Sequence, residues 1–233
     1  SSDVCSSDLL LAVDKVNKSG GLNGNKVDLI VYDDRHNPKE SVAIANKLTE
    51  KDKVVAIVSG SYSMPTRVSA PIINKAGIPM VAGYAVDPSI TKAGPYIFRN
   101  GFLGKVEGKA AGEVAMNLLK AKTIAMFTID NDYGRAISAG FRERVKKFNG
   151  KVVYEHAFAI GTKDFSAMLT KVKELAPDLL FISGYYAEAA MAVRQAKDLG
   201  ITAKILGEEG FDSPKFLELA GDAAEGVVIT TNL

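Results

Sequence analysis

The side chains with potential for binding chemistry stand in short polar segments, each directly after an apolar run. Two segments, 59–65 (SGSYSMP) and 82–88 (AGYAVDP), offer hydroxyl groups and backbone N–H and C=O groups. Three more, 130–134 (DNDYG), 184–186 (GYY) and 207–211 (GEEGF), offer tyrosine rings and carboxylates. Hydroxyl and N–H groups suit an anion such as a carboxylate, whereas carboxylates and carbonyls suit an ammonium group. Such a set favours the binding of a small charged molecule.

The motifs of bond-breaking chemistry are absent from the sequence. It contains no G-x-G-x-x-G after a strand, no G-x-x-x-x-G-K-[ST] and no G-x-S-x-G. His36 and His156 have no nucleophile nearby in sequence, which favours structural or solvated roles. Asp33 and Asp34 could serve as metal ligands or acid/base groups, but a strand end followed by Asn37 as a helix cap is favoured. We therefore expect no enzyme activity, no cofactor and no metal.

The composition limits the classes of partner that the protein is expected to bind. The 29 Lys and Arg against 27 Asp and Glu leave a net charge of +2, too near neutrality for a nucleic-acid binder. No apolar run approaches the roughly 20 residues that span a bilayer, so the chain is expected to be soluble. The single cysteine, Cys5, cannot form an internal disulfide, and with two histidines it makes a zinc site improbable. A near-neutral surface is compatible with a monomer, which we expect.

Short β-rich runs alternate with amphipathic helical stretches at a spacing of roughly 25 to 30 residues, the pattern of βα units in a parallel sheet. Strands are predicted at 27–32, 54–58, 79–81, 96–99, 123–129, 152–159, 179–183, 204–206 and 226–230. Helices are predicted at 38–50, 65–76, 105–119, 133–148, 164–175, 187–199 and 214–220. The fold class is therefore α/β, with parallel sheets flanked by helices.

The rhythm breaks at 99–104, where two glycines follow a strand and a long helix begins. This predicts a crossover between lobe 1 (10–101) and lobe 2 (102–233). Residues 1–9, SSDVCSSDL, share no pattern with the rest and resemble translated adapter sequence, so we interpret them as a non-native scar. Because the pattern then opens on a helix, we expect the first strand and a C-terminal part to be missing from an internal fragment.

In open α/β sheets, ligands bind outside the carboxyl ends of the strands, so the segments there are the candidate site. Ser63 opens a helix and either binds an anion or simply caps that helix. Tyr133 and Tyr185 follow two strands at equivalent positions, and each could cover an apolar ligand or belong to the rim or core. Glu208 and Glu209 suggest acid/base catalysis, but adjacent residues on an extended chain point to opposite sides. Only one of them can face a cleft.

At these residues the sequence resembles the periplasmic substrate-binding proteins of ABC transporters for branched-chain amino acids, the Leu/Ile/Val-binding family with the type I two-lobed fold. The similarity runs from about Leu11 to the last residue. It is carried, in order, by AVDKVNKSGGLNGNKVDLIVYDD, NPKESVAIANKL, DYG, KDFSAMLTKVK, SGYY and GEEGF.

The resemblance implies roles for six residues. It implies that Ser63 binds the ligand carboxylate, and that the backbone of Tyr84 and Val86 meets the ammonium and carboxylate groups. It further implies that Glu209 neutralises the ammonium while Tyr133 and Tyr185 close over the ligand. Val86 departs from the Thr or Ser usual in the family, and the missing hydroxyl could change which zwitterion binds.

The resemblance also implies a function. An extracytoplasmic solute-binding protein would capture a small amino acid or amide between two lobes, close by hinge bending near 100–104, and deliver its ligand to a membrane permease. Its location would be periplasmic, or lipid-anchored outside the cytoplasmic membrane. The alternative is a ligand-sensing domain of a regulator or receptor, and an enzyme is the third and least favoured class. Fold alone does not identify the ligand.

Overall fold

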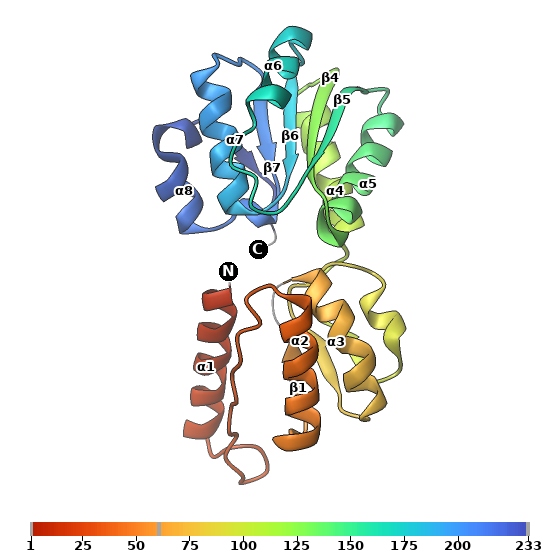
Figure 1. The fold of residues 1–233 in the computed structure, drawn as a ribbon, viewed down its shortest axis with the longest axis vertical. Coiled ribbons are helices and arrows are strands. Elements are labelled where there is room, and N and C mark those ends of the chain that lie inside the picture. The colour runs from red at the N-terminus through yellow and green to blue at the C-terminus, as the bar shows by residue number, and fades with distance from the viewer. Residues whose placement is uncertain (1, 60–61, 232–233) are drawn as a thin grey trace. The chain divides into compact units, whose positions relative to one another are not determined.

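The computed structural model describes residues 2–59 and 62–231. It divides into two compact units between Gly101 and Phe102, which are drawn in Figure 1. Within the described residues, no helix combines the length and the apolar character that a membrane crossing requires.

Unit 1 contains a small parallel sheet in the order β1-β2-β3. Its strands are β1 (Ile57–Ser59), β2 (Met80–Ala82) and β3 (Ile97–Arg99), and its helices are α1 (Ser2–Lys18), α2 (Pro38–Asn46) and α3 (Ser63–Lys75), with short helical segments at Lys47–Lys51 and Ile90–Ala93. The Asn37 side chain accepts from the backbone N–H groups of Lys39 and Glu40, so the predicted cap of α2 is confirmed. Residues 2–9, interpreted from the sequence as a scar, form one continuous helix, α1, with residues 10–18, where the sequence pattern opens on a helix.

The strand predicted at 27–32 is wrong. This segment forms no ladder with β1, and among the described residues of unit 1 no other strand runs beside it. The backbone N–H and C=O of Val27 instead bond to the Asn17 side chain, at 2.8 and 2.9 Å. Its apolar residues Ile30 and Val31 remain exposed. The residues of this segment favour a β-strand, but a strand forms only where a neighbouring strand supplies hydrogen-bonding partners for its backbone N–H and C=O groups.

Unit 2 contains a five-stranded parallel sheet in the order β5-β4-β6-β7-β8. Its strands are β4 (Thr123–Ile129), β5 (Lys151–Phe158), β6 (Leu179–Ser183), β7 (Lys204–Gly207) and β8 (Val228–Ile229). Its helices are α4 (Gly104–Glu113), α5 (Asp132–Lys147), α6 (Ser166–Leu175), α7 (Tyr186–Asp198) and α8 (Pro214–Ala220), with short helical segments at Val114–Leu118, Glu209–Phe211 and Gly221–Ala224. The predicted elements of this unit are confirmed, with small shifts at their ends.

The strand order of unit 2 creates a switch point. Strand β4 leads through α5 to β5 on one side of it, whereas its other neighbour β6 leads through α7 to β7 in the opposite direction. Figure 1 shows α4 and α5 on one side of this sheet and α7 and α8 on the other. The crossovers therefore diverge between β4 and β6, which is where α/β sheets receive ligands.

Helices α4 and α5 approach so closely that two glycines are required. A Cβ atom on Gly108 would lie 1.9 Å from the Ile137 carbonyl oxygen, and one on Gly140 would lie 2.1 Å from the Lys105 carbonyl oxygen. Beneath them, the rings of Phe141 on α5 and Phe181 on β6 stack at 3.8 Å between centroids. This packing fixes α4 and α5 on the sheet that carries the candidate site of unit 2.

Candidate ligand-binding loops

In unit 1, Ser63 is the first residue of α3 and its side chain is buried. Its Oγ accepts hydrogen bonds from the backbone N–H groups of Val86 (3.2 Å) and Asp87 (3.3 Å). The N-cap of α3 is Tyr62, without a side-chain cap bond, so the alternative role of Ser63 as a plain helix cap is wrong. The serine instead links the start of α3 to the loop after β2. With its lone pairs so used, the hydroxyl keeps its O–H as a donor.

Arg99, on β3, holds the same loop. Its guanidinium donates from Nη1 to the Ala85 carbonyl and from Nη2 to the Asp87 carbonyl. Burial lowers the pKa of Arg99, while the charge of Asp87 acts in the opposite direction. Because two loop carbonyls are already bonded to a cation, this part of unit 1 suits a carboxylate better than an ammonium group.

The two predicted residues of this loop differ in exposure. Tyr84 is 42 % exposed, whereas the Val86 side chain is only 1 % exposed and packs inside the unit. The Val86 side chain is therefore not accessible to a ligand. Its backbone N–H donates to Ser63 Oγ.

In unit 2, the rings of Tyr133 and Tyr185 stack with centroids 5.0 Å apart and planes at 24°. Tyr133 follows β4 and is buried, and Tyr185 follows β6 and is half-buried. Asn131 supports both: its Oδ1 caps α5 by accepting from Gly134 N at 2.9 Å, and its Nδ2 donates to the Tyr185 hydroxyl at 3.2 Å. Two predicted site residues thus meet at the switch point of the sheet.

The adjacent glutamates at the end of β7 have different surroundings. Glu208 is fully buried, and its carboxylate accepts from the Tyr133 hydroxyl and from the backbone N–H groups of Gly184 and Gly210, both at 2.8 Å. Glu209 is half-buried, and its backbone N–H donates to Glu107 Oε1 at 2.9 Å. Among the described residues, none donates a hydrogen bond to the Glu209 carboxylate or pairs with it.

Burial governs the acidity of this region. It raises the pKa of Glu209 to about 7, with the charge of Asp212 adding to the effect. It also raises the pKa values of Glu107 and Glu208 above their ordinary range, although the donors around Glu208 act to lower it. In the part of the chain that the structure describes, no group of three or more His, Cys, Asp or Glu residues is arranged to hold a metal ion.

Sequence reasoning missed the supporting residues. Glu107 lies on the buried face of α4 among small residues, and Asn131 precedes α5 in a pattern typical of a helix cap. The sequence did offer a signal for Glu107, because a glutamate is unusual at a helical position that otherwise holds small apolar residues. Nothing local indicated that Arg99 reaches the loop after β2, because that contact depends on the pairing of β2 with β3.

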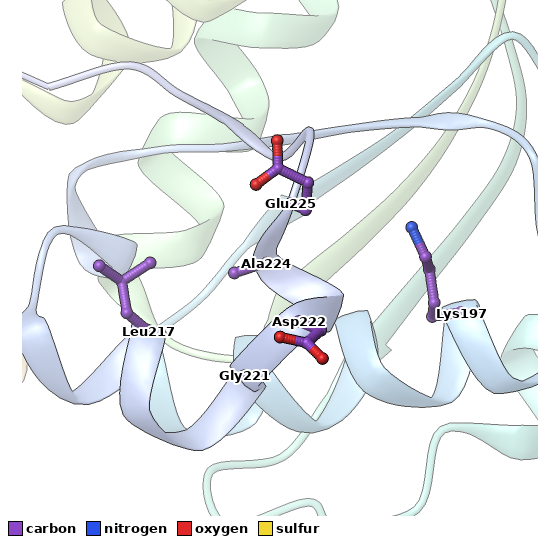
Figure 2. Close-up of a pocket in the computed structure, with 6 residues that line it drawn as sticks. All are labelled: Lys197, Leu217, Gly221, Asp222, Ala224 and Glu225. Carbon is purple, nitrogen blue, oxygen red and sulfur yellow. The ribbon is translucent and has the colours of Figure 1, made fainter.

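A separate hollow in unit 2 lies away from these loops. Figure 2 shows its lining residues, which come from the end of α7, from α8 and from the segment after it: Lys197, Leu217, Gly221, Asp222, Ala224 and Glu225. None of the predicted site residues lines it, so we place the candidate site at the strand ends.

Parallel sheets flanked by helices, with polar loops after the strands, place the chain among the α/β proteins, which receive ligands at the carboxyl ends of their strands. A profile of the family described as "Periplasmic binding protein" matches residues 8–233, and the chain belongs to this family. This agrees with the resemblance and the fold class inferred from the sequence.

Individual relatives are consistent with this membership. The chain is 34% identical over 222 residues to the leucine-, isoleucine-, valine-, threonine- and alanine-binding protein of Pseudomonas aeruginosa, covering 95% of the chain and 59% of that protein. It is 30% identical over 220 residues to the Leu/Ile/Val-binding protein of Escherichia coli, covering 94% of the chain and 60% of that protein. The chain therefore spans about 60% of the length of these curated relatives.

Solved structures show the same fold. The branched-chain amino acid transporter substrate-binding protein of Streptococcus pneumoniae, in complex with isoleucine, superposes with a TM-score of 0.89 at 31% identity, covering 94% of the chain and 63% of that protein. A second match is a solute-binding protein of an ABC transporter from Rhodopseudomonas palustris, in complex with 3,4-dihydroxybenzoic acid. It superposes with a TM-score of 0.83 at 26% identity, covering 97% of the chain and 64% of that protein. Relatives on this scaffold thus include complexes with an amino acid and with an aromatic acid.

Proposed function

We propose that the full-length protein is an extracytoplasmic solute-binding protein that captures a small aliphatic amino acid and delivers it to an ABC permease. The observation that carries the proposal is the Glu209 carboxylate, which has a pKa of about 7 and no cationic or hydrogen-bonding partner among the described residues. A partly desolvated carboxylate gains most from a positively charged ligand group placed beside it. The ammonium group of an amino acid meets that requirement.

Unit 1 supplies groups for the other end of a zwitterion. The Ser63 hydroxyl can donate to a carboxylate, and the start of α3 adds a favourable dipole. Arg99 occupies the carbonyl groups of Ala85 and Asp87 in the neighbouring loop, and Tyr84 and the Val86 backbone lie in that loop. We assign the ligand carboxylate to this unit and its ammonium group to unit 2.

Tyr133 and Tyr185 are assigned to the apolar part of the ligand, because tyrosine combines an apolar ring with a polar hydroxyl. The relatives named for leucine, isoleucine and valine support an aliphatic side chain. We further propose that 10–101 and 102–233 act as lobes that close about 100–104 and that the protein works in the periplasm as a monomer, without enzymatic activity.

Isothermal titration of the full-length protein tests this function. L-leucine, L-isoleucine and L-valine are expected to bind, whereas 4-methylpentanoate, which is leucine without its ammonium group, is expected to bind at least about tenfold more weakly. Glu209→Gln is expected to weaken L-leucine binding and to leave 4-methylpentanoate binding unchanged or stronger. Binding of 3,4-dihydroxybenzoate in preference to every amino acid tested would assign the site to aromatic acids instead.

A further inference from the structure

Glu208 joins three turns that lie far apart in sequence. Its Oε1 accepts from Gly184 N in the turn after β6, and its Oε2 accepts from Gly210 N in the turn after β7 and from the Tyr133 hydroxyl after β4. These are the segments that carry the unit 2 site residues of the proposed function. We call residues 130–134, 184–186 and 208–211 the three turns.

The three turns are also in close contact around Gly210. A Cβ atom on Gly210 would lie 2.2 Å from the Gly184 carbonyl oxygen and 2.7 Å from the Tyr133 hydroxyl oxygen. The turns therefore leave no space for a side chain where they meet. A small displacement of one turn must move the others, because packed elements transmit strain.

We propose that Glu208 is a positioning residue that sets the arrangement of the three turns and thereby the affinity of the ligand site, a role that rests on the proposed function only for the identity of the ligand. Tyr133 and Tyr185 are held for stacking because Glu208 fixes the Tyr133 hydroxyl and the amide of Gly184, the neighbour of Tyr185. Glu209 is held because Glu208 binds Gly210 on one side while Glu107 binds the Glu209 amide.

The chemistry of the contacts requires a carboxyl group. Each oxygen of Glu208 faces a backbone N–H, and a backbone N–H can only donate. A glutamine has one carbonyl oxygen and one NH₂ group, so in either orientation its NH₂ faces one of the two amides. Glu208→Gln therefore keeps the size of the side chain but loses at least one bond to the turns.

Glu188 offers a matched control. It is a buried glutamate in the first turn of α7, and its Oε1 accepts from Gly161 N at 2.7 Å. Gly161 follows β5 and belongs to none of the three turns. Glu188→Gln makes the same carboxyl-to-amide change in the same unit, but its carbonyl oxygen can still accept from Gly161, so it controls for the substitution itself.

The test measures amide hydrogen exchange and L-leucine affinity in the full-length protein. Glu208→Gln is expected to speed exchange about tenfold or more at one or both of Gly184 and Gly210 and to weaken L-leucine binding about tenfold or more. Glu188→Gln is expected to leave exchange at Gly184 and Gly210 like the parent and affinity within about twofold. Parent-like exchange or affinity in Glu208→Gln, or an equal loss of affinity in Glu188→Gln, overturns the proposal.

Tyr133→Phe provides a second variant that removes one bond and adds no group. It is expected to weaken L-leucine binding in the parent protein but to change it less than about twofold in the Glu208→Gln background, because the hydroxyl acts through Glu208. Independent losses that multiply would show that the hydroxyl acts on the ligand directly, against the proposal. If the parent binds no amino acid, the proposed function fails, and the exchange rates alone decide the role of Glu208.

Discussion

The Tyr133 ring lies against the Tyr185 ring at 5.0 Å, although the two residues follow different strands, β4 and β6. These strands are neighbours in the sheet, with Thr128 aligned to Ser183 close to their carboxyl ends. Parallel pairing brings both strand ends to one edge, so the stack is a direct product of the sheet order. It places two stacked rings at the switch point of unit 2, of which Tyr133 is the buried inner ring and Tyr185 the half-buried outer ring that forms part of the surface.

Removing the outer ring tests the value of this surface. Tyr185→Ala is expected to weaken L-leucine binding about tenfold or more, because it removes apolar contact area together with a ring stack. The adjacent Tyr186→Ala serves as the control, since Tyr186 has no ring contact among the described residues. Titration calorimetry of both variants measures the difference, and equal losses would remove Tyr185 from the site.

Ligand affinity is expected to depend on pH through Glu209. Its pKa of about 7 in the free protein must fall when an ammonium group lies beside it, so protons compete with the ligand. Affinity for L-leucine is expected to be greatest near pH 8, below the range in which the ligand's own ammonium group loses its proton, and to be about thirtyfold weaker near pH 5.5. Titrations across this range check it, and Glu209→Gln should bind weakly with no such slope. A flat profile in the parent would contradict the assignment.

The stability of the ligand-free protein should show the opposite trend from its affinity. Glu209 has a raised pKa when folded and an ordinary one near 4.5 when unfolded, so between these values the folded state holds more protons. The free energy of unfolding therefore falls as pH rises from about 5 to 8, and Glu107 and Glu208 contribute in the same direction. Thermal unfolding at several pH values measures this trend. A melting temperature that rises over this range would count against the raised pKa values.

Ser63 is expected to matter for both stability and binding. Ser63→Ala leaves the buried N–H groups of Val86 and Asp87 without their acceptor, which costs about 1–3 kcal/mol. Ser69→Ala, in the same helix, is the control: its hydroxyl donates only to the Pro65 and Thr66 carbonyls, so no donor is orphaned. Urea unfolding and L-leucine titration of both variants should show losses for Ser63→Ala that exceed those for Ser69→Ala. Similar losses would argue against a special role for Ser63.

The close approach of α4 and α5 predicts a stability effect remote from the ligand. Gly108→Ala places a methyl group where the Ile137 carbonyl lies, so the helices must separate at a cost of about 1–3 kcal/mol. Val106→Ala, at an exposed position of the same helix, should change stability by less than about 0.5 kcal/mol. Thermal unfolding compares the two, and an unchanged melting temperature for Gly108→Ala would show that the helices can yield.

Periodicity predicted unit 2 well because its central strands β4 and β6 are almost wholly buried, and because α5 and α8 begin with side-chain caps from Asn131 and Ser213. Strand β6, with all five residues buried, was located from its apolar run alone. The strand prediction at 27–32 failed because the pairing of strands is not a local property. The residues of this segment favour a strand, but the backbone of Val27 bonds to the Asn17 side chain. In unit 1, β1 (Ile57–Ser59) and β3 (Ile97–Arg99) also proved shorter than predicted, whereas β2 is shifted by one residue.

For the candidate site, the sequence identified the segments but not the contacts within them. Ser63, Tyr133 and Glu209 stand out by their place after strands, which is a local signal. The carboxylate of Glu208 and the guanidinium of Arg99 act across strands, and such contacts follow from sheet order and register, which a single sequence does not specify. The residues that hold the loops were therefore less visible than the residues that the loops present.

The sharing of one buried carboxylate among three turns constrains how this half of the protein can be redesigned. Grafting a single turn from a relative with another solute preference would leave a donor or an acceptor in this arrangement without its counterpart. Engineering toward a new solute would thus have to exchange the turns after β4, β6 and β7 as one cassette.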